Sequence, residues 1–482
     1  MIPASAPALE PIVVDLDGTL TYTDTFWECI CSLLRRRTFS LAYALTKLRQ
    51  GRATFKQHIA GLADFDAGAL PLNNDLIVWL RQERRAGRRL VLATASDRSI
   101  AQAVADHVDL FDEVLASDGD RNLKGPAKAV ALVERFGVNG FDYVGDSRAD
   151  LPVWAAARHA IVVGGEKLVK AAAQVTEVRD RFAPPERSRA VLLALRPHQW
   201  VKNLLVFLPL VAAHRFADDA TLPAATLAFV IFCLAASSVY VLNDLIDLPS
   251  DRAHARKRQR PFASGRLPLA WGVLLSALLL VAAAALGLLF LPPLFNTVLA
   301  GYYLLTAAYS FGLKREPILD VILLAGLYTV RVIAGAAAVA IVPSFWLLAF
   351  SMFIFLSLAL AKRYTELDEL RQRGELIAPG RGWHIDDLPL IQTLGSSSGL
   401  ACVLVLALYI DSAPATRLYA APQVLWLFCP LLLYWITRLW FITQRGQMHD
   451  DPVVFALRDR VSLRTGAVGA GIVLLASVGL PL

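Results

Sequence analysis

Long apolar segments occupy only the second part of this chain. From Trp200 to Leu482, apolar runs long enough to cross a bilayer alternate with polar loops, whereas the preceding part carries charges throughout and has no such run. A short polar stretch with the pair Pro184-Pro185 separates the two parts. We therefore predict three regions: a soluble domain over 1–180, a linker over 181–195 and a membrane domain over 196–482.

The apolar runs predict nine membrane spans. The loops after the second, fourth, sixth and eighth of them are rich in Lys and Arg, and the alternate loops are poor in both. By the positive-inside rule, the cation-rich loops and the soluble domain lie in the cytoplasm, so we expect a multi-pass protein of the inner (cytoplasmic) membrane. The expected spans lie near 200–213, 222–242, 270–290, 293–311, 318–341, 344–361, 390–410, 422–441 and 465–482.

The composition agrees with a membrane protein. Of the 482 residues, 56% are hydrophobic and only 18% are charged, which is too apolar for an ordinary soluble chain of this length. The net charge of +7 follows from the cation-rich loops, so a nucleic acid partner need not be invoked. Apolar lipid-facing helices and apolar subunit contacts have the same composition, so a homo-oligomer remains open.

Acidic residues follow two predicted strands of the soluble domain. One apolar strand ends in Asp15 and Asp17, and another ends in Asp146, with Asp150 four residues later. Because ligands gather at the carboxyl ends of strands in open α/β sheets, these carboxylates are candidates for one site. Asp15 would attack a phosphoryl group, and Asp17 would protonate the leaving oxygen and later activate water.

Two further positions complete this constellation. A third strand is followed by Thr94, and Lys124 and Lys128 lie at the start of a predicted helix. Together the four motifs resemble the haloacid dehalogenase-like phosphatase family. The resemblance implies an α/β Rossmann-like fold, with a helical cap over about 21–75 that closes over the site.

The same resemblance implies roles for these residues. Mg²⁺ would be held by Asp15, Asp17 and Asp146, with support from Asp150. Thr94 would bind the phosphoryl oxygens, and a lysine would neutralise charge. Lys128 fits the helix pattern better, because Leu132 follows it at i+4, and Lys124 is the alternative.

A second group of acids ends an apolar segment of the membrane domain. At helical spacing, Asp244, Asp247 and Asp251 share one face, with Asn243 four residues before Asp247. Oxygen ligands on that face could hold Mg²⁺, which usually shares its shell with substrate phosphates. Cations follow at once, so the segment predicts a site for a diphosphate leaving group: Arg252, Arg256, Lys257, Arg258 and Arg260. The alternative is a charged loop retained in the cytoplasm by its cations.

This segment resembles the acid-rich motif of the UbiA-type intramembrane prenyltransferase superfamily, and the resemblance implies an all-α bundle of nine transmembrane helices. A closer resemblance is to its decaprenyl-phosphate phosphoribosyltransferase branch. The motifs that carry it are 196–203, 243–261, 309–314, Asp320-Val321, Arg331 and 362–367. This branch transfers a ribosyl group from 5-phosphoribosyl diphosphate to a polyprenyl phosphate such as decaprenyl phosphate.

The resemblance and the charges suggest a mechanism for the transfer. Mg²⁺ would be held against the diphosphate by Asp244, Asp247 and Asp251, together with Asn243 and Asp320. The charge of the departing diphosphate would be stabilised by Arg252, Lys257, Arg258 or Arg260. The remaining polar residues beside apolar helices are candidates to orient the acceptor or the 5-phosphate. They are Lys202, Asn203, Lys314, Arg331 and Lys362. For Lys202, Asn203 and Arg331, the alternative is an interfacial residue or a helix cap.

The two domains together suggest a two-step enzyme. The transfer product would still carry a 5-phosphate, which a fused phosphatase could remove to give polyprenyl-phosphoryl-ribose. One alternative is an isoprenyl diphosphate donor, with a phosphatase of unrelated substrate. Another is a transporter with a regulatory phosphatase, although the chain has no convincing internal repeat.

Overall fold

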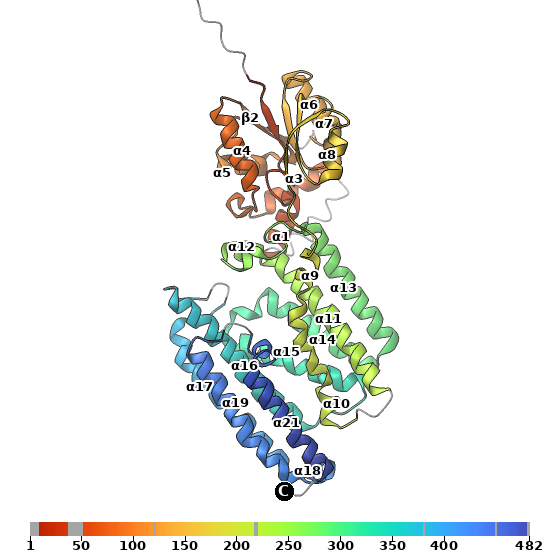
Figure 1. Ribbon diagram of the computed structural model, residues 1–482, viewed down its shortest axis with the longest axis vertical. Helices are drawn as coiled ribbons and strands as arrows, with labels where there is room; N and C mark the ends of the chain where they lie inside the picture. Colours follow the sequence, from red (N-terminus) through yellow and green to blue (C-terminus); the bar gives the residue numbers. More distant parts are fainter. Residues whose placement is uncertain are drawn as a thin grey trace, which may run out of the picture. The chain divides into compact units, whose positions relative to one another are not determined.

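The protein is described by a computed structural model over residues 9–36, 52–118, 122–215, 220–378, 381–448 and 451–479 (Figure 1). Its Cα atoms form two compact units. The first unit joins Met1–Leu195 with Tyr240–Ser276, and the second joins Arg196–Val239 with Ala277–Leu482. The acid-rich segment of the membrane domain therefore packs with the soluble part of the chain.

The first unit is built on a six-stranded sheet. All the neighbouring strands pair in parallel, in the order β3-β2-β1-β4-β5-β6. The strand order reverses at β1, which lies between β2 and β4, so their carboxyl ends border the crevice where such sheets bind ligands. The strands are β1 Ile12–Val14, β2 Leu90–Asp97, β3 Glu113–Ser117, β4 Asp142–Gly145, β5 His159–Val163 and β6 Glu177–Phe182.

Helices cover both faces of the sheet because its central strands are apolar on both sides. Ile12 and Val14 pack on one face with α4 (Asn74–Arg85) and α5 (Arg98–Val108). Val13 points to the other face, where α6 (Pro126–Phe136) and α7 (Leu151–Trp154) pack. The α8 helix, Glu166–Ala172, lies between β5 and β6 in the sequence. The predicted α/β class is confirmed.

The expected cap region contains α1 (Thr25–Arg36), α3 (Arg52–Leu62) and the 3₁₀ turn η2 (Ala67–Ala69). Cys29 and Leu33 of α1 pack with Phe55 and Ile59 of α3. Residues 37–51 of the expected cap lie outside the described residues. The described part is helical, as the sequence predicts.

The acid-rich segment is broken into two helices. α11 (Thr221–Ile246) ends just before Asp247, and α12 (Leu248–Ala253) begins just after it. Pro249 lacks an N–H group, so the regular hydrogen bonding of a single helix is interrupted here. The Asp247 and Asp251 N–H groups still donate to carbonyls four residues earlier, at 2.8 and 2.9 Å.

The second unit is α-helical, and so are the helix ends that extend from it into the first unit. Seven described helical segments are long and apolar enough to cross a membrane, in α11, α13, α15, α16, α17, α19 and α21. The helices beyond α12 are α13 Leu269–Phe290, α14 Pro293–Phe311, α15 Pro317–Ala338, α16 Phe345–Gln372, α17 Leu388–Ile410, α18 Ala413–Leu418, α19 Phe428–Gln444, α20 Pro452–Ala456 and α21 Arg460–Val478.

Two of the nine expected spans differ from this set. The segment near 200–213 is a 3₁₀ helix, η4 (Pro197–Phe207), followed by the short α10 (Leu208–Ala212), because Pro209 cannot continue the backbone hydrogen bonds of η4. The span over 293–311 is a helix, α14, but is not among the seven candidates. Its polar residues, which include Asn296 and Ser310, lower its hydropathy.

Candidate active sites

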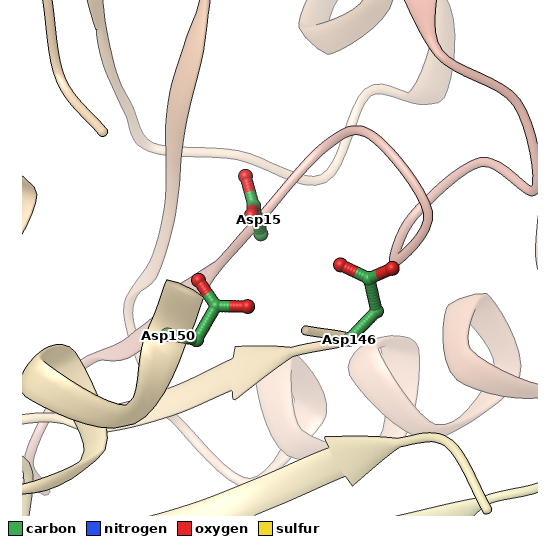
Figure 2. A group of neighbouring side chains, drawn as sticks. All are labelled: Asp15, Asp146 and Asp150. Atoms are coloured by element: carbon green, nitrogen blue, oxygen red, sulfur yellow. The ribbon is translucent and has the colours of Figure 1, made fainter. Parts of the chain in front are cut away.

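Three carboxylates meet beyond the carboxyl ends of β1 and β4. Asp15, Asp146 and Asp150 each place an oxygen within 4.8 Å of the others, and Figure 2 shows their side chains around a shared space. Asp15 follows β1 directly, Asp146 follows β4, and Asp150 ends the 3₁₀ turn η3 (Arg148–Asp150). The parallel pairing of β1 with β4 brings these acids together.

A buried lysine neutralises part of this charge. The Nζ atom of Lys128 lies 2.9 Å from Oδ1 of Asp15 and donates to the Tyr143 hydroxyl at 3.0 Å. That hydroxyl donates in turn to Oδ1 of Asp150, also at 3.0 Å. Lys128 is 3% exposed, whereas Lys124 is exposed. Of the two lysines, Lys128 is therefore the one at the site.

Asp17 lies on the same loop but faces the cap. Its Oδ1 accepts the Thr25 N–H at 2.8 Å, and its Oδ2 accepts the Ser96 hydroxyl at 2.6 Å. Thr94 is fully buried, and its hydroxyl accepts the Ser96 N–H at 3.1 Å. The strand β2 continues past Thr94 through a register irregularity, so Ser96 rather than Thr94 contacts Asp17.

Burial, and after it the charges of neighbouring acids, raises the pKa values of these carboxylates. Burial, with the charges of Asp150 and Asp17 added, raises the pKa of Asp15 to about 6, although Lys128 opposes the shift. Burial and then Asp15 and Asp150 raise the pKa of Asp146 to about 8. Burial and Asp24 raise the pKa of Asp17 to about 6, against the hydrogen bonds from Ser96 and Thr25. Closely spaced carboxylates with raised pKa values are a donor set that fits Mg²⁺.

The acid-rich segment forms a second cluster of charges in the first unit. Asp244 and Asp251 are both 2% exposed, and Nη1 of Arg260 contacts Oδ2 of Asp251 at 2.6 Å and Oδ1 of Asp244 at 3.2 Å. Burial raises the pKa of Asp251 although Arg260 opposes it. Asp247 and Asn243 are half-buried beside them. Two buried carboxylates that share one cation are a donor set that fits Mg²⁺.

The other cations of this segment have different surroundings. Lys257 and Arg258 are exposed on the 3₁₀ turn η5 (Lys257–Gln259). The guanidinium of Arg252 instead contacts both carboxylate oxygens of Glu28, at 2.6 and 3.0 Å. The five predicted phosphate-binding cations therefore do not form one cluster.

In the second unit, Asp320 lies at the centre of a buried polar network. Its side chain accepts from Tyr309 at 2.7 Å and from the indole of Trp383 at 2.8 Å. Arg363 contacts it at 2.5 Å and Arg381 at 3.3 Å. Asp320 is fully buried, so its charge serves to hold two arginines in fixed positions. Lys314 is half-buried on the 3₁₀ turn η6, Leu313–Arg315.

A second network in this unit joins two of the predicted lysines. Oδ2 of Asp451 lies 2.8 Å from Nζ of Lys202 and 2.9 Å from Nζ of Lys362. Although burial alone would raise the pKa of Asp451, these two lysines lower it well below its usual value. One carboxylate thus occupies the point on which two cations converge.

The predicted residues Asn203, on η4, and Arg331, on α15, contact each other. The Arg331 Nε donates to the amide oxygen of Asn203 at 2.9 Å, and its Nη2 donates to the hydroxyl of Tyr302 at 3.0 Å. Both residues are buried. Arg331 also lies over the ring of Tyr302, 4.9 Å from its centroid, so its charge is held in place from several sides.

An apolar cavity of about 360 Å³ opens in the same unit. Its lining comes from η4, α11 and the region of α20. The residues are Pro197, His198, Trp200, Val201, Leu204, Phe229, Val454, Leu457 and Arg458. Such a lining suits a hydrocarbon chain.

Sequence reasoning missed several of the contacting residues. Asp451 is 249 positions from Lys202, and Arg381 is 61 positions from Asp320. Nothing in their local sequence distinguishes them from other charges of the polar loops. Tyr143 lies in the strand that leads to Asp146, and Ser96 comes two residues after Thr94, so their nearness to recognised motifs was a usable signal.

Comparisons with known proteins match both parts of the chain. The profile of the UbiA prenyltransferase family matches residues 204–463, and that of the haloacid dehalogenase-like hydrolases matches residues 12–154. The chain belongs to the UbiA prenyltransferase family. It carries a haloacid dehalogenase-like domain at its amino-terminal end, and it is a multi-pass membrane protein of the transferase class.

Relatives of this UbiA-family chain have different names. An uncharacterized protein y4nM of Sinorhizobium fredii is 37% identical over 95% of this chain and 89% of its own length. Nodulation protein NoeC of Azorhizobium caulinodans is 37% identical over 56% of this chain and 87% of its own length. A decaprenyl-phosphate phosphoribosyltransferase of Mycolicibacterium smegmatis is 33% identical over 59% of this chain and 92% of its own length.

Among solved structures, a UbiA homolog from Archaeoglobus fulgidus bound to GPP and Mg²⁺ aligns with a TM-score of 0.46. It is 16% identical and covers 59% of this chain and 99% of its own.

Proposed function

We propose that this UbiA-family protein transfers a 5-phosphoribosyl group from 5-phosphoribosyl diphosphate to a polyprenyl phosphate and then removes the 5-phosphate. The observation that carries the proposal is that one chain holds two charged clusters. One is the aspartate and lysine cluster around Asp15, and the other is the acid-rich segment around Asp244 and Asp251. Relatives named decaprenyl-phosphate phosphoribosyltransferase support the choice of substrates.

In the first step, the acid-rich segment would hold the diphosphate of the donor. Asp244, Asp247, Asp251 and Asn243 would bind Mg²⁺, which supplies neutralising charge for the diphosphate. Arg260, which now bridges two of these acids, would turn to the leaving diphosphate. The bond between the ribosyl carbon and the diphosphate oxygen breaks, and an oxygen of the acceptor phosphate forms the new bond.

The acceptor would bind where cations of the second unit converge. Lys202 and Lys362 already share one carboxylate, so they are spaced to share one phosphate. Arg331, Asn203 and Lys314 would contact the same phosphate or the 5-phosphate. The apolar cavity beside η4 would take part of the polyprenyl chain. Asp320 would orient Arg363 and Arg381 toward the substrates.

In the second step, the soluble domain would act as a phosphatase. Asp15 attacks the phosphorus and the ribose oxygen leaves, protonated by Asp17, whose raised pKa of about 6 suits an acid and base near neutral pH. Water, deprotonated by Asp17, then releases phosphate from Asp15. Lys128 and Thr94 would hold the phosphoryl oxygens. Asp15, Asp146 and Asp150, whose oxygens lie within 4.8 Å of one another, would hold the Mg²⁺ that offsets their charge, with Asp17 beside them on the loop after β1.

The membrane topology belongs to the same proposal. Nine spans in the inner membrane, with the cation-rich loops and the soluble domain in the cytoplasm, would bring both sites to the side where a phosphorylated sugar donor is available. Along the sequence, the domains would be 1–180 and 196–482, joined by a linker over 181–195.

Mass spectrometry of lipid products would test the proposal. Purified protein would receive Mg²⁺, 5-phosphoribosyl diphosphate and a polyprenyl phosphate, in parallel with Asp15→Asn, Asp247→Ala and the exposed control Glu166→Gln. We expect polyprenyl-phosphoryl-ribose from wild type and from the control. Asp15→Asn should stop at the 5-phosphorylated lipid, and Asp247→Ala should give no ribosylated lipid.

Each part of the proposal can fail separately. If Asp15→Asn forms the dephosphorylated lipid as fast as wild type, the soluble domain does not act on the transfer product. If wild type forms no ribosylated lipid but consumes an isoprenyl diphosphate, the donor assignment is wrong and the chain is an isoprenoid transferase.

A further inference from the structure

Helix α1 of the soluble part packs directly against the acid-rich segment of the membrane part. Both belong to the first compact unit, where α1 lies close to α12 (Figure 1). The buried residues Leu245, Phe262 and Leu267 form one apolar cluster with Cys31, and Trp27 packs against it. The turn η2 of the cap also contacts α12. The contact thus has an apolar core formed from residues of both regions.

An ion pair is part of this contact. Oε1 of Glu28 lies 2.6 Å from Nη2 of Arg252, and Oε2 lies 3.0 Å from Nη1, so the two groups meet in a two-point, fork-like arrangement. The Nε of Arg252 donates to the carbonyl of Ala263 at 3.0 Å. The side chains are 9% and 10% exposed. All three guanidinium nitrogens of Arg252 therefore have partners: two contact Glu28, and the third contacts Ala263 later in the acid-rich segment.

A glycine allows a close backbone approach between the two regions. Gly265 has φ of +73°, and a Cβ atom there would lie 2.5 Å from Cβ of Tyr22 and 3.2 Å from its carbonyl oxygen. Tyr22 belongs to the loop that follows Asp15 and Asp17, and its hydroxyl donates to Asn73 at 2.9 Å. The contact therefore includes the loop of the phosphatase site as well as α1.

Glu28 is connected to the phosphatase site through the start of α1. Thr25, the first residue of this helix, donates its N–H to Asp17, and the hydroxyl of Thr23 donates to Oε1 of Glu28 at 2.7 Å. At the other end of the contact, Asp251 immediately precedes Arg252 and pairs with Arg260. A short chain of fixed contacts thus leads from Asp17 to the acids of the transfer site.

From these contacts we infer that Glu28 is a positioning residue for the transfer reaction, acting through Arg252 on the acid-rich segment. The pair fixes the turn between α12 and Ala263, and so sets the spacing of Asp251 and Arg260. Arg252 accordingly serves as an anchor, and the donor diphosphate is left to Arg260 and the exposed Lys257 and Arg258. The soluble domain is then part of the machinery that holds the transferase site.

Hydrogen exchange of the full-length protein tests the docking without any substrate. Replacing the carboxylate in Glu28→Gln should speed exchange of amides in 248–266, while Glu166→Gln, an exposed glutamate on α8, should leave them as in wild type. The double substitution Glu28→Arg with Arg252→Glu should restore the protection of these amides. If Glu28→Gln leaves the exchange of 248–266 unchanged, the inference is overturned.

Transfer kinetics then test positioning, and this arm rests on the proposed function. We expect Glu28→Gln to raise KM for 5-phosphoribosyl diphosphate about tenfold, within the range of coupling between contacting residues, with a smaller change in kcat. The double substitution should recover most of the lost affinity for the donor. Faster exchange with unchanged KM would reduce Glu28 to a structural contact and refute the positioning role. A wild type without transferase activity would instead refute the proposed function, and the exchange data would still decide the docking.

Discussion

At the scale of single residues, Gly18 determines how closely the loop after β1 approaches Asp146. Its φ is +78°, a conformation that side chains disfavour, and a Cβ atom there would lie 2.1 Å from Oδ2 of Asp146. Gly137 has a similar φ of +85°, but a Cβ atom there meets nothing within 4 Å. The two glycines therefore separate the effect of backbone strain from that of a clash.

We predict that Gly18→Ala removes the phosphatase activity, by about a hundredfold or more, because the methyl group displaces a carboxylate of the site. Gly137→Ala should keep the activity, although both changes carry a strain of about 1–2 kcal/mol. Steady-state hydrolysis of a phosphorylated substrate and thermal unfolding of both variants would check this. Equal activity in the two variants would contradict a tight approach at Gly18.

Among individual site residues, those beside a recognisable strand or helix could be predicted from the sequence. Asp15, Asp146 and Lys128 meet because parallel pairing brings strand ends together, and the sequence indicates where strands end. Asp451 and Glu28 could not be found in this way. Their partners lie 249 and 224 positions away, and such pairings depend on the packing of whole helices.

At the scale of elements, Asp320 connects several parts of the second unit. It lies on α15, Arg363 on α16 and Tyr309 on α14, while Arg381 and Trp383 precede η7 (Ile385–Asp387). Removing the charge of Asp320 would leave the buried Arg363 and the half-buried Arg381 to share the partly exposed carboxylate of Glu366. Such a loss is far more costly than the loss of an exposed pair.

We therefore predict that Asp320→Asn destabilises the protein by about 3–5 kcal/mol. The pair of Arg89 with Glu113, at 2.6 Å, provides the comparison because its side chains are 49% and 19% exposed. Glu113→Gln should cost about 1 kcal/mol or less. Thermal unfolding in detergent would measure both, and a similar small loss in the two variants would show that the Asp320 network carries little stability.

The raised pKa values of the carboxylates at the strand ends predict how the stability of the protein depends on pH. Burial, followed by neighbouring carboxylates, raises the pKa of Asp146 to about 8, and burial raises that of Asp15 to about 6. The folded state then binds more protons than the unfolded state above about pH 4, so stability without Mg²⁺ falls as the pH rises toward about 8.

Mg²⁺ should counteract this loss, since it binds the deprotonated carboxylates. We expect the gain in Tm on adding Mg²⁺ to increase between pH 6 and 8 and to level off above pH 8. Thermal scans with and without Mg²⁺ across this range would measure it, and Asp146→Asn should flatten the dependence. A gain that is constant from pH 6 to 8 would speak against cation binding at these residues.

Most elements could be predicted from the sequence, and the exceptions have physical causes. The three strands that were predicted, β1, β2 and β4, are buried and largely apolar, and most membrane helices are long apolar runs, so these were recognisable. Strand β6, with charged residues at Glu177, Arg179, Asp180 and Arg181, was not predicted. The first predicted span instead forms η4 and α10, since an apolar run does not distinguish a 3₁₀ helix from an α-helix. The break between α11 and α12 is marked only by Pro249.

At the scale of the whole molecule, the charge distribution predicts on which side of the membrane each loop lies. Four of the five native cysteines are buried, so added thiols would dominate labelling. We expect Ser188→Cys, in the exposed stretch before α9 (Ala190–Leu195), to react with an impermeant maleimide only in inside-out vesicles. Val342→Cys, at a position 90% exposed, should react only in right-side-out vesicles. Reaction of both from the same side would contradict the topology.

The composition of the first compact unit also bears on how the protein is made. Residues Met1–Leu195 leave the ribosome well before Tyr240–Ser276, although both belong to this unit. The apolar side of α1 at Cys31 and Trp27 therefore stays uncovered while the first membrane segments are synthesised and inserted. During that interval the nascent soluble part exposes an apolar surface that chaperones can bind. Its folding is completed only after the first membrane segments have been inserted.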